Sequence, residues 1–358
     1  MQEDEFTETT DWLTNTERIL TVVGTWPKNK TNLRFILSLV YMTIFVVMQW
    51  ADFVSHIDDL QELADILLNQ DCENNKTRLS PSEKRKYALC NSKGKTFVKI
   101  FTFFVGATCV FYYLKPLPII VLAANRNGST SLVLPFRTSL SFERTDAYVY
   151  AVLYVCQMGA LLQIFLGYVG THALLITLMM HICGELSVLS ERIVNIKKQM
   201  EKGHRCEIQK IITRHLRLIW MAKEIDTAFT VVLLSQVISS EIMICVAGFN
   251  MIVYSANSEK TAFITFAFYE VAALVDLYVY CFIGECLILE STRISDAVYD
   301  CAWYEMPPSQ AKDLILVMAR SQKPLHLTAG KVFVFSLEIF SEFVKTSMAY
   351  LSVLRAMT

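Results

Sequence analysis

The sequence has few of the residues from which the loops of enzyme active sites are built. Only 12 of its 358 residues are glycine and 8 are proline. It contains no Gly-x-Ser-x-Gly elbow, no His-Glu-x-x-His pair and no phosphate-binding glycine loop. No two carboxylates have a spacing that suggests acid/base catalysis. We therefore predict that the protein is not an enzyme.

The ten cysteines also lack a recognisable pattern. None forms a Cys-x-x-Cys pair, and none combines with histidine at the spacing of a zinc site. Most lie in apolar stretches, where a cysteine usually serves as a small buried hydrophobic residue; examples are Cys109, Cys156, Cys245 and Cys281. We predict no disulfide framework, no metal and no cofactor.

Charged residues are sparse, at 19% of the chain, and the net charge is −1. Hydrophobic residues make up 53% of the chain and the mean hydropathy is +0.38. This composition is too apolar for a soluble chain that folds around one core, and it indicates a protein embedded in a lipid bilayer. Residues 1–18 are acidic and polar, so no cleavable signal peptide is predicted.

Apolar segments long enough to cross the roughly 30 Å hydrocarbon core of a bilayer recur along the chain. Basic residues gather before the first segment and in the loop at residues 185–226, and such residues mark the cytosolic side. A cytosolic loop explains this basic run without a nucleic-acid partner. We expect the amino terminus in the cytosol and the carboxyl terminus outside. The expected spans are Leu33–Val54, Thr96–Leu114, Ala147–Met180, Thr227–Tyr254, Thr261–Leu289 and a segment from Gly330 almost to the end.

Two common classes of membrane protein do not fit this sequence. The predicted orientation is opposite to that of G-protein-coupled receptors, and the Asp-Arg-Tyr and Asn-Pro-x-x-Tyr motifs are absent. Transporters commonly show internal repeats and helices broken by glycine or proline at the membrane midplane, and the sequence shows neither.

One crossing is missing from this plan. Residues 52–95 contain no apolar run of sufficient length, since the best candidate, Leu60–Leu68, includes Glu62 and Asp65. Basic residues between Lys84 and Lys99 nevertheless place the start of the next span in the cytosol. The chain leaves the cytosol at its first span and must return without a visible second crossing.

The last sixty residues, Val298–Met357, are predicted to form two helical parts joined by a breaker. Pro307 and Pro308 suit the start of the first helix, which contains the apolar run Leu314–Met318. Pro324 then interrupts the helical pattern.

The second helix is predicted to start at Gly330, with Thr328 as its N-cap, and to be about 27 residues long, enough to cross a bilayer. It contains Glu338, Glu342 and Lys345, which are costly in lipid unless they face protein or water. Two interpretations are open. Glu342 and Lys345, three residues apart, form a buried ion pair, or the helix lies beside an aqueous path.

A series of short motifs runs through the last sixty residues: Trp303 and Tyr304 followed by Pro307, Arg320-Ser321-Gln322-Lys323-Pro324, Thr328-Ala329-Gly330-Lys331, Ser336-Leu337-Glu338, Lys345-Thr346-Ser347 and Tyr350-Leu351-Ser352-Val353-Leu354-Arg355. Together they resemble the C-terminal signature of insect odorant receptors. A shorter element near the start, Gly24-Thr25-Trp26-Pro27, is similar to the beginning of that family. The resemblance covers the last sixty residues well and the middle of the chain more loosely.

The resemblance implies an all-α, polytopic membrane helix bundle with a cytosolic N-terminus, an extracellular C-terminus and a plan of seven spans. Relative to that plan roughly 30 residues, most of the second span, are absent near Leu60; a divergent re-entrant segment at Leu60–Leu68 is the alternative. The implied parts are a cytosolic N-terminal segment (1–32), transmembrane helices (33–290) with a cytosolic loop (185–226), a cytosolic anchor helix (291–330) and a pore-lining last helix (331–358).

By the same resemblance, the chain would be an odorant-tuned subunit of a ligand-gated, non-selective cation channel. Its partners would be an odorant co-receptor, in a heterotetramer, and a small volatile ligand, in the plasma membrane of a sensory-neuron dendrite. The co-receptor itself has a much longer cytosolic loop before the fifth span, so this chain is not expected to be one. Two alternatives remain: a non-conducting truncated isoform and a gustatory-receptor-like channel for tastants.

The resemblance also assigns residues of the pore. It places the gate at Val353 and Met357, and a spacing of four puts both on one face of the last helix. Ala356 takes the position of a pore-lining glutamine in the co-receptor. Thr346 and Glu342 are expected to line the pore below the gate.

The implied ligand site is a small, mainly apolar cavity in the outer half of the membrane. Aromatic residues of three spans are its candidates, with ordinary helix packing as the alternative: Phe104, Phe111, Tyr112, Tyr150, Tyr154, Phe266 and Tyr269. The implied anchor between subunits comprises Trp303, Tyr304, Leu314, Leu316 and Val317.

Overall fold

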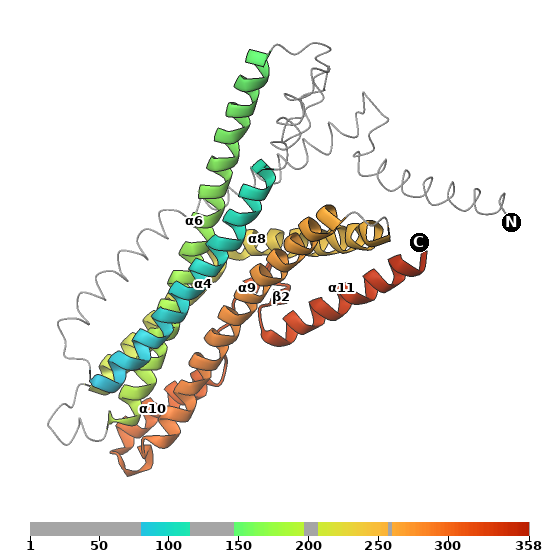
Figure 1. Ribbon diagram of the computed structural model, residues 1–358. Helices are drawn as coiled ribbons and strands as arrows, with labels where there is room; N and C mark the ends of the chain where they lie inside the picture. The colour runs from blue at the N-terminus through green and yellow to red at the C-terminus, as the bar shows by residue number, and fades with distance from the viewer. Residues whose placement is uncertain (1–79, 115–146, 197–206, 257–259, 358) are drawn as a thin grey trace.

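The computed structural model describes residues 80–114, 147–196, 207–256 and 260–357, which are drawn as coloured ribbons in Figure 1. The predicted first span, Leu33–Val54, and the predicted gap at Leu60–Leu68 lie outside the described residues. Both remain predictions.

Four long helices form the body of the described structure: α4 (Pro81–Leu114), α6 (Ala147–Val194), α8 (Glu207–Ala256) and α9 (Lys260–Asp300). All four are long and apolar enough to cross a membrane. Figure 1 shows α4 running beside α6, and α9 contacts α4, α6 and α8. The predicted all-α class is confirmed for the described residues apart from one small hairpin.

The helices extend beyond the apolar segments that the sequence marks as spans. α4 begins at Pro81, whereas the predicted span began at Thr96. Its start is a capping box, because the Ser80 amide donates to Glu83 Oε2 at 2.9 Å and the Glu83 amide donates to Ser80 Oγ at 3.3 Å. α6 and α8 likewise continue through most of the predicted loop at residues 185–226, so much of that basic segment is helical.

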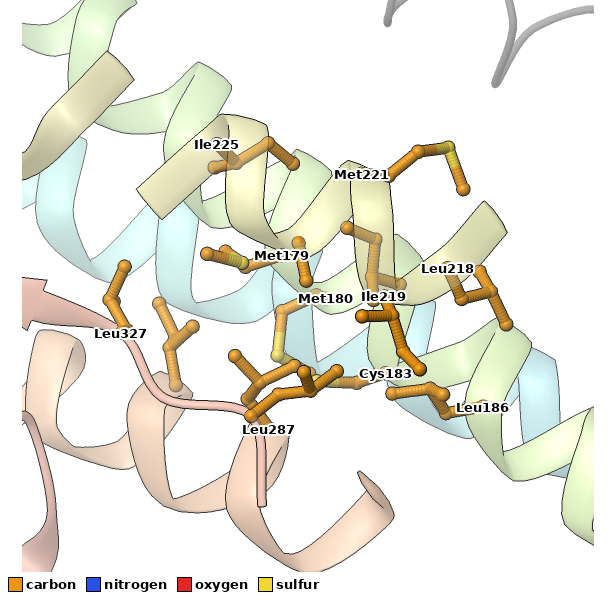
Figure 2. Close-up of a cluster of buried hydrophobic side chains, with 14 of the residues drawn as sticks. Met179, Met180, Cys183, Leu186, Leu218, Ile219, Met221, Ile225, Leu287 and Leu327 are labelled. Atoms are coloured by element: carbon orange, nitrogen blue, oxygen red, sulfur yellow. The ribbon is translucent and has the colours of Figure 1, made fainter. Parts of the chain in front are cut away.

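The core lies around the inner half of α6. Every residue of α6 from 182 to 190 is buried, and because successive residues of a helix point about 100° apart, this covers all of its sides. Other helices must therefore enclose α6 here, and burying each large side chain such as Ile182 or Leu186 contributes about 1.5–3 kcal/mol. Figure 2 shows this cluster, where Met179, Met180, Cys183 and Leu186 of α6 face Leu218, Ile219, Met221 and Ile225 of α8.

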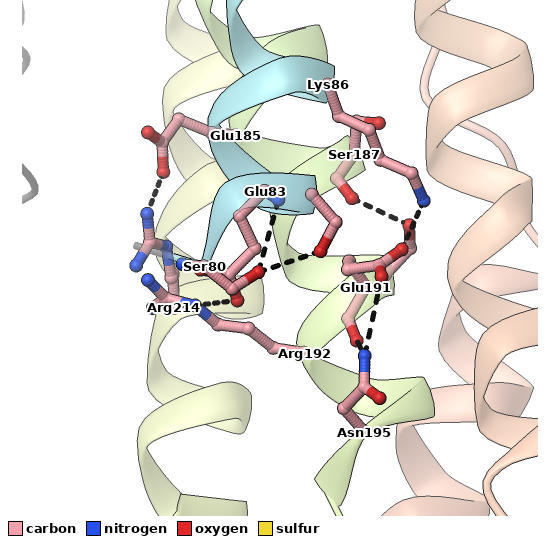
Figure 3. A network of polar contacts seen from close by, with 11 residues as sticks. Ser80, Glu83, Lys86, Glu185, Ser187, Glu191, Arg192, Asn195 and Arg214 are labelled. Carbon is pink, nitrogen blue, oxygen red and sulfur yellow. Dashed lines mark hydrogen bonds and ion pairs between the residues drawn. The ribbon is translucent and has the colours of Figure 1, made fainter. Parts of the chain in front are cut away.

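A network of ion pairs closes the end of the bundle beside this core (Figure 3). It connects α4 to α6 twice and α6 to α8 once, so each pair joins two different helices. Its pairs are Glu83–Arg192 (3.2 Å), Lys86–Glu191 (2.5 Å) and Glu185–Arg214.

After α9 the chain forms a 3-10 turn, η1 (Trp303–Glu305), and α10 (Pro308–Ser321), which begins at the predicted proline pair. A two-stranded antiparallel hairpin follows, β1 (Thr328–Ala329) with β2 (Phe333–Val334), and then α11 (Leu337–Met357).

The prediction that the last helix starts at Gly330 with Thr328 as its N-cap is wrong. Thr328 lies in β1, and both Gly330 and Lys331 have left-handed backbones, with φ angles of 61° and 58°, which end any helical pattern there. α11 begins seven residues later. Its 21 residues give a length of about 32 Å at 1.5 Å per residue, still enough for a bilayer.

The Glu185–Arg214 pair offers a test of this packing. The Glu185 side chain is 1% exposed, so Arg214→Met leaves its charge buried and is expected to cost about 3–5 kcal/mol of folding free energy. The measurement is the thermal unfolding midpoint of the detergent-purified chain. The matched control is Lys210→Met, which removes an exposed partner of Glu207 and should cost about 0–1 kcal/mol. Equal effects of the two variants would contradict the assigned role of Glu185.

Candidate functional site

An apolar cavity of about 510 Å³, open to the outside at Val110, Val155 and Leu162, lies between α4 and α6. Its volume is in the range of small-molecule sites, and its walls are almost entirely hydrophobic. No charged residue lines it. The lining residues are Gly106, Cys109 and Val110 of α4 and Val155, Met158, Gly159, Leu161, Leu162 and Phe165 of α6.

Two glycines account for the space in this cavity. A Cβ atom built at Gly159 meets nothing within 4 Å, and one built at Gly106 would only touch the Phe165 ring at 3.7 Å. Both glycines are therefore places where a larger residue would project into the cavity or against its wall. Shape and dispersion would select a ligand here, because the walls offer few polar groups.

The predicted aromatic residues whose side chains the structure describes do not line this cavity. Phe104 and Phe111 of α4 instead both contact Phe268 of α9, with ring centroids 5.9 Å and 5.1 Å away. Phe266 of α9 stacks on Tyr254 of α8, at 5.5 Å between ring centroids. These residues fasten α4 and α8 to α9.

The remaining candidates are less fully placed. Tyr269 contacts Phe266 edge to face, at 6.3 Å between ring centroids. Tyr154 is half-buried and directly precedes the lining residue Val155. The side chains of Tyr112 and Tyr150 lie outside the described part of the structure. The one sequence signal that could have found the cavity is the pair of span glycines described above.

A buried polar layer lies one turn further along α6. The Tyr280 hydroxyl of α9 and His172 Nδ1 of α6 share a 2.7 Å hydrogen bond, and Phe101 of α4 stacks on Tyr168. Asp276 is 9% exposed, and its Oδ1 has no hydrogen-bond partner in the described part of the chain. This layer joins α4, α6 and α9 at the inner side of Phe165.

Unlike the four long helices, α11 has no sufficiently apolar stretch of membrane length with at most two charged residues. It carries Glu338, Glu342, Lys345 and Arg355, which is more than a lipid-facing helix tolerates. Glu342 and Lys345 are both exposed, and no ion pair joins these two described residues. The alternative of a buried ion pair is therefore not what the structure shows, and the charges point to protein or water outside this chain.

α11 packs against α8 and α9 and leaves a groove of about 550 Å³ along α8. Glu342, Thr346 and Tyr350 line the groove from α11, while Glu241 and Cys245 line it from α8. Val353, Ala356 and Met357 belong to the helical backbone of α11, but their side chains lie outside the described part.

The predicted anchor residues separate into two groups. Leu314 and Val317 are 0% and 5% exposed and pack into the core of their own chain. Leu316 and Tyr304 are 62% and 69% exposed. Trp303 is half-buried, with its ring centroid 6.1 Å from that of Tyr304. Of these residues, Leu316 and Tyr304 are the ones that another chain could contact.

Comparison with known proteins decides the family. The sequence profile described as "7tm Odorant receptor" matches residues 31–348. The chain belongs to the odorant receptor family. Members of this family are receptors and channels, so the prediction that the protein is not an enzyme is confirmed. With four helices of membrane length, it is a multi-pass membrane protein.

Individual odorant receptors resemble the chain over most of its length. Odorant receptor 13a of Drosophila melanogaster is 25% identical over 296 residues, which are 77% of this chain and 69% of that protein. Odorant receptor 49a of the same organism is 25% identical over 279 residues, which are 76% of this chain and 68% of that protein.

The fold also matches a solved receptor. The insect olfactory receptor OR5 from Machilis hrabei superposes with a TM-score of 0.66 at 16% identity, covering 98% of this chain and 99% of that one. The same receptor in complex with eugenol gives a TM-score of 0.65 at 15% identity, covering 98% of each chain. At such identities the likeness establishes the fold.

Filling the cavity should prevent occupancy by a ligand. Gly159→Phe projects a ring into the open space of the cavity. We therefore expect that about tenfold or more of an apolar volatile is needed to stabilise the purified variant as much as the unmodified chain. The measurement is the thermal shift under a panel of small volatiles. Gly170→Phe is the matched control, because Gly170 lies on the same helix, also faces open space and is not a lining residue. If both variants respond like the unmodified chain, the cavity is not the ligand site.

Proposed function

We propose that this chain is an odorant-tuned subunit of a ligand-gated, non-selective cation channel that assembles with an odorant co-receptor. The observation that carries the proposal is α11, a helix of membrane length whose charges cannot face lipid, in a chain of the odorant receptor family. A helix of this kind is suited to line a water-filled pore. Its exposed Glu342 and Thr346, which line the groove along α8, are the polar residues that would meet permeating cations.

The gate would lie beyond these residues, at Val353 and Met357. Apolar side chains at a spacing of four form a hydrophobic stripe on one face, and a narrow apolar stretch closes a pore by expelling water. Ala356 would contribute no amide to the pore. The groove along α8 leaves room for α11 to move sideways when the pore widens.

The ligand would occupy the cavity between α4 and α6. A volume of about 510 Å³ with hydrophobic walls suits a small volatile molecule better than a charged tastant. Phe104, Phe111, Phe266 and Tyr269 would act from outside the cavity, since they connect α4 and α8 to α9 and so couple its wall to the rest of the bundle.

The co-receptor would bind the outward face of the anchor. Leu316 and Tyr304 expose large apolar surfaces that a partner subunit would cover, while Leu314 and Val317 hold α10 against its own chain. By the predicted topology, this anchor would lie in the cytosol and the gate near the outer face of the plasma membrane. The membrane would be that of a sensory-neuron dendrite.

The test is whole-cell current from cells that express this chain with and without an insect odorant co-receptor, with surface labelling in parallel. We expect a cation current that depends on a volatile ligand only in the co-expressing cells. Surface-labelled protein that gives no current under a broad panel would contradict the proposal. Absence from the surface, rescued by inserting a second span near Leu60, would identify a non-conducting truncated isoform.

Shortening the gate is expected to make the pore leak. Val353→Ala removes two methyl groups from the proposed constriction, which weakens the expulsion of water, so the basal current should rise several-fold at equal surface density. The control is Val332→Ala, an exposed position in the hairpin outside α11. An unchanged leak and an unchanged dose response in Val353→Ala would place the gate elsewhere.

A further inference from the structure

The segment that joins α10 to α11, residues 322–336, is attached to two other helices at several points. We call it the connector. It contains the β1–β2 hairpin, and Leu325, Leu327, Ala329 and Phe335 are all buried in it. A connector with this much buried apolar surface is not a flexible link between the two helices.

Two hydrogen-bonded contacts attach the connector to α8. Asp226 of α8 accepts the Thr328 amide at 2.6 Å and the Thr328 hydroxyl at 2.9 Å and 3.0 Å through its two oxygens. One turn further along α8, the Thr230 carbonyl accepts the Gly330 amide at 3.0 Å. The tight turn brings Gly330 so close that a Cβ atom there would lie 2.7 Å from Leu234.

Three contacts attach it to α9. Ser291 Oγ accepts the Leu325 amide at 3.0 Å, and Glu285 Oε2 accepts the amide of Leu337, the first residue of α11, at 3.2 Å. Between them, a Cβ atom at Gly284 would lie 2.2 Å from the Phe335 carbonyl oxygen, so the connector backbone lies directly against α9.

These contacts fix the first turn of α11 to α8 and α9. Beyond that turn, most of the side chains of α11 are exposed or half-buried on this chain. A displacement of α8 against α9 therefore reaches the first turn of α11 through the connector. Among the contacts, Asp226–Thr328 is the one between a carboxylate and two donors of a single residue, which makes it strong and directional.

We propose that Asp226 is a positioning residue for channel opening: by holding Thr328, it makes the root of α11 follow α8 when ligand binding moves the bundle. The proposal rests on the proposed channel function. Without this contact we expect the pore still to assemble, because the exposed Leu316 and Tyr304, proposed to bind the partner, and the α9 contacts of the connector remain. What is lost is the transmission of the ligand signal to the pore-lining helix.

The test compares two substitutions of one residue. Thr328→Val removes the hydroxyl but keeps the shape and the strand preference, whereas Thr328→Ser keeps the hydroxyl. Both are expressed with the co-receptor, and the ratio of ligand-evoked to basal current is measured at equal surface density. We expect Thr328→Val to lower this ratio by at least about fivefold, the lower end of typical coupling factors, and Thr328→Ser to preserve it.

Asp226→Ala should lower the ratio like Thr328→Val. Its matched control is Glu224→Ala, because Glu224 lies two residues earlier on α8 and has no hydrogen bond to the connector in the described structure. A purely structural role would reduce the amount of surface protein and leave the ratio intact. That result, or a normal ratio in Thr328→Val, would overturn the proposal.

Hydrogen exchange of the purified chain separates this proposal from the channel function itself. In Asp226→Ala the amides of Thr328 and Gly330 should exchange faster than in the unmodified chain and in Glu224→Ala. The unmodified chain could carry no current while Asp226→Ala still exchanges these amides faster than the unmodified chain does. In that case the channel proposal fails, but the attachment of the connector by Asp226 stands. Unchanged exchange would show that Asp226 does not hold the connector.

Discussion

The all-round burial of α6 is the constraint on which the rest of the described structure depends. Because every residue of α6 from 182 to 190 is buried, α6 is surrounded at its inner half by α4, α8 and α9. The ion pairs of Figure 3 then lie where the enclosing helices meet at its end. At the other end of α6 the enclosure is looser, and the cavity between α4 and α6 lies there. A rigid inner half and an open outer half are what a ligand-responsive bundle requires.

α11 follows the opposite logic. Among the helices that the structure describes, its main contacts are with α8 and α9, and its charged and exposed side chains need protein or water to cover the remaining faces. Leu314 and Val317 are buried and fix α10 within its own chain, whereas Leu316 and Tyr304 are exposed. The two exposed residues are the ones proposed to contact a partner subunit. The single chain thus encloses the inner half of α6 but leaves much of the surface of α11 uncovered.

Much of this could be predicted from the sequence, because helices of membrane length depend on composition along one continuous segment. The four long helices are of that kind, and the proline pair marked the start of α10. The residues that line the cavity were not predicted, since its position depends on which faces of α4 and α6 meet; Phe104 and Phe111, which were chosen for it, pack on Phe268 of α9 instead. Gly106 and Gly159 mark the cavity better than the aromatic residues do. A cavity forms where side chains are small or absent, whichever residues complete its walls.

The error at the last helix has a different physical origin. Thr328 has the side chain of an N-cap, and a local pattern assigns its hydroxyl to the next amides of the same segment. The structure gives that hydroxyl to Asp226, 102 residues earlier, and caps α11 with Ser336, whose Oγ accepts the Ile339 amide at 3.3 Å. A partner so distant leaves no trace in local spacing. The same fact explains why the connector matters: a residue used by its own helix would only begin that helix, whereas a residue held by α8 ties the movement of one helix to another.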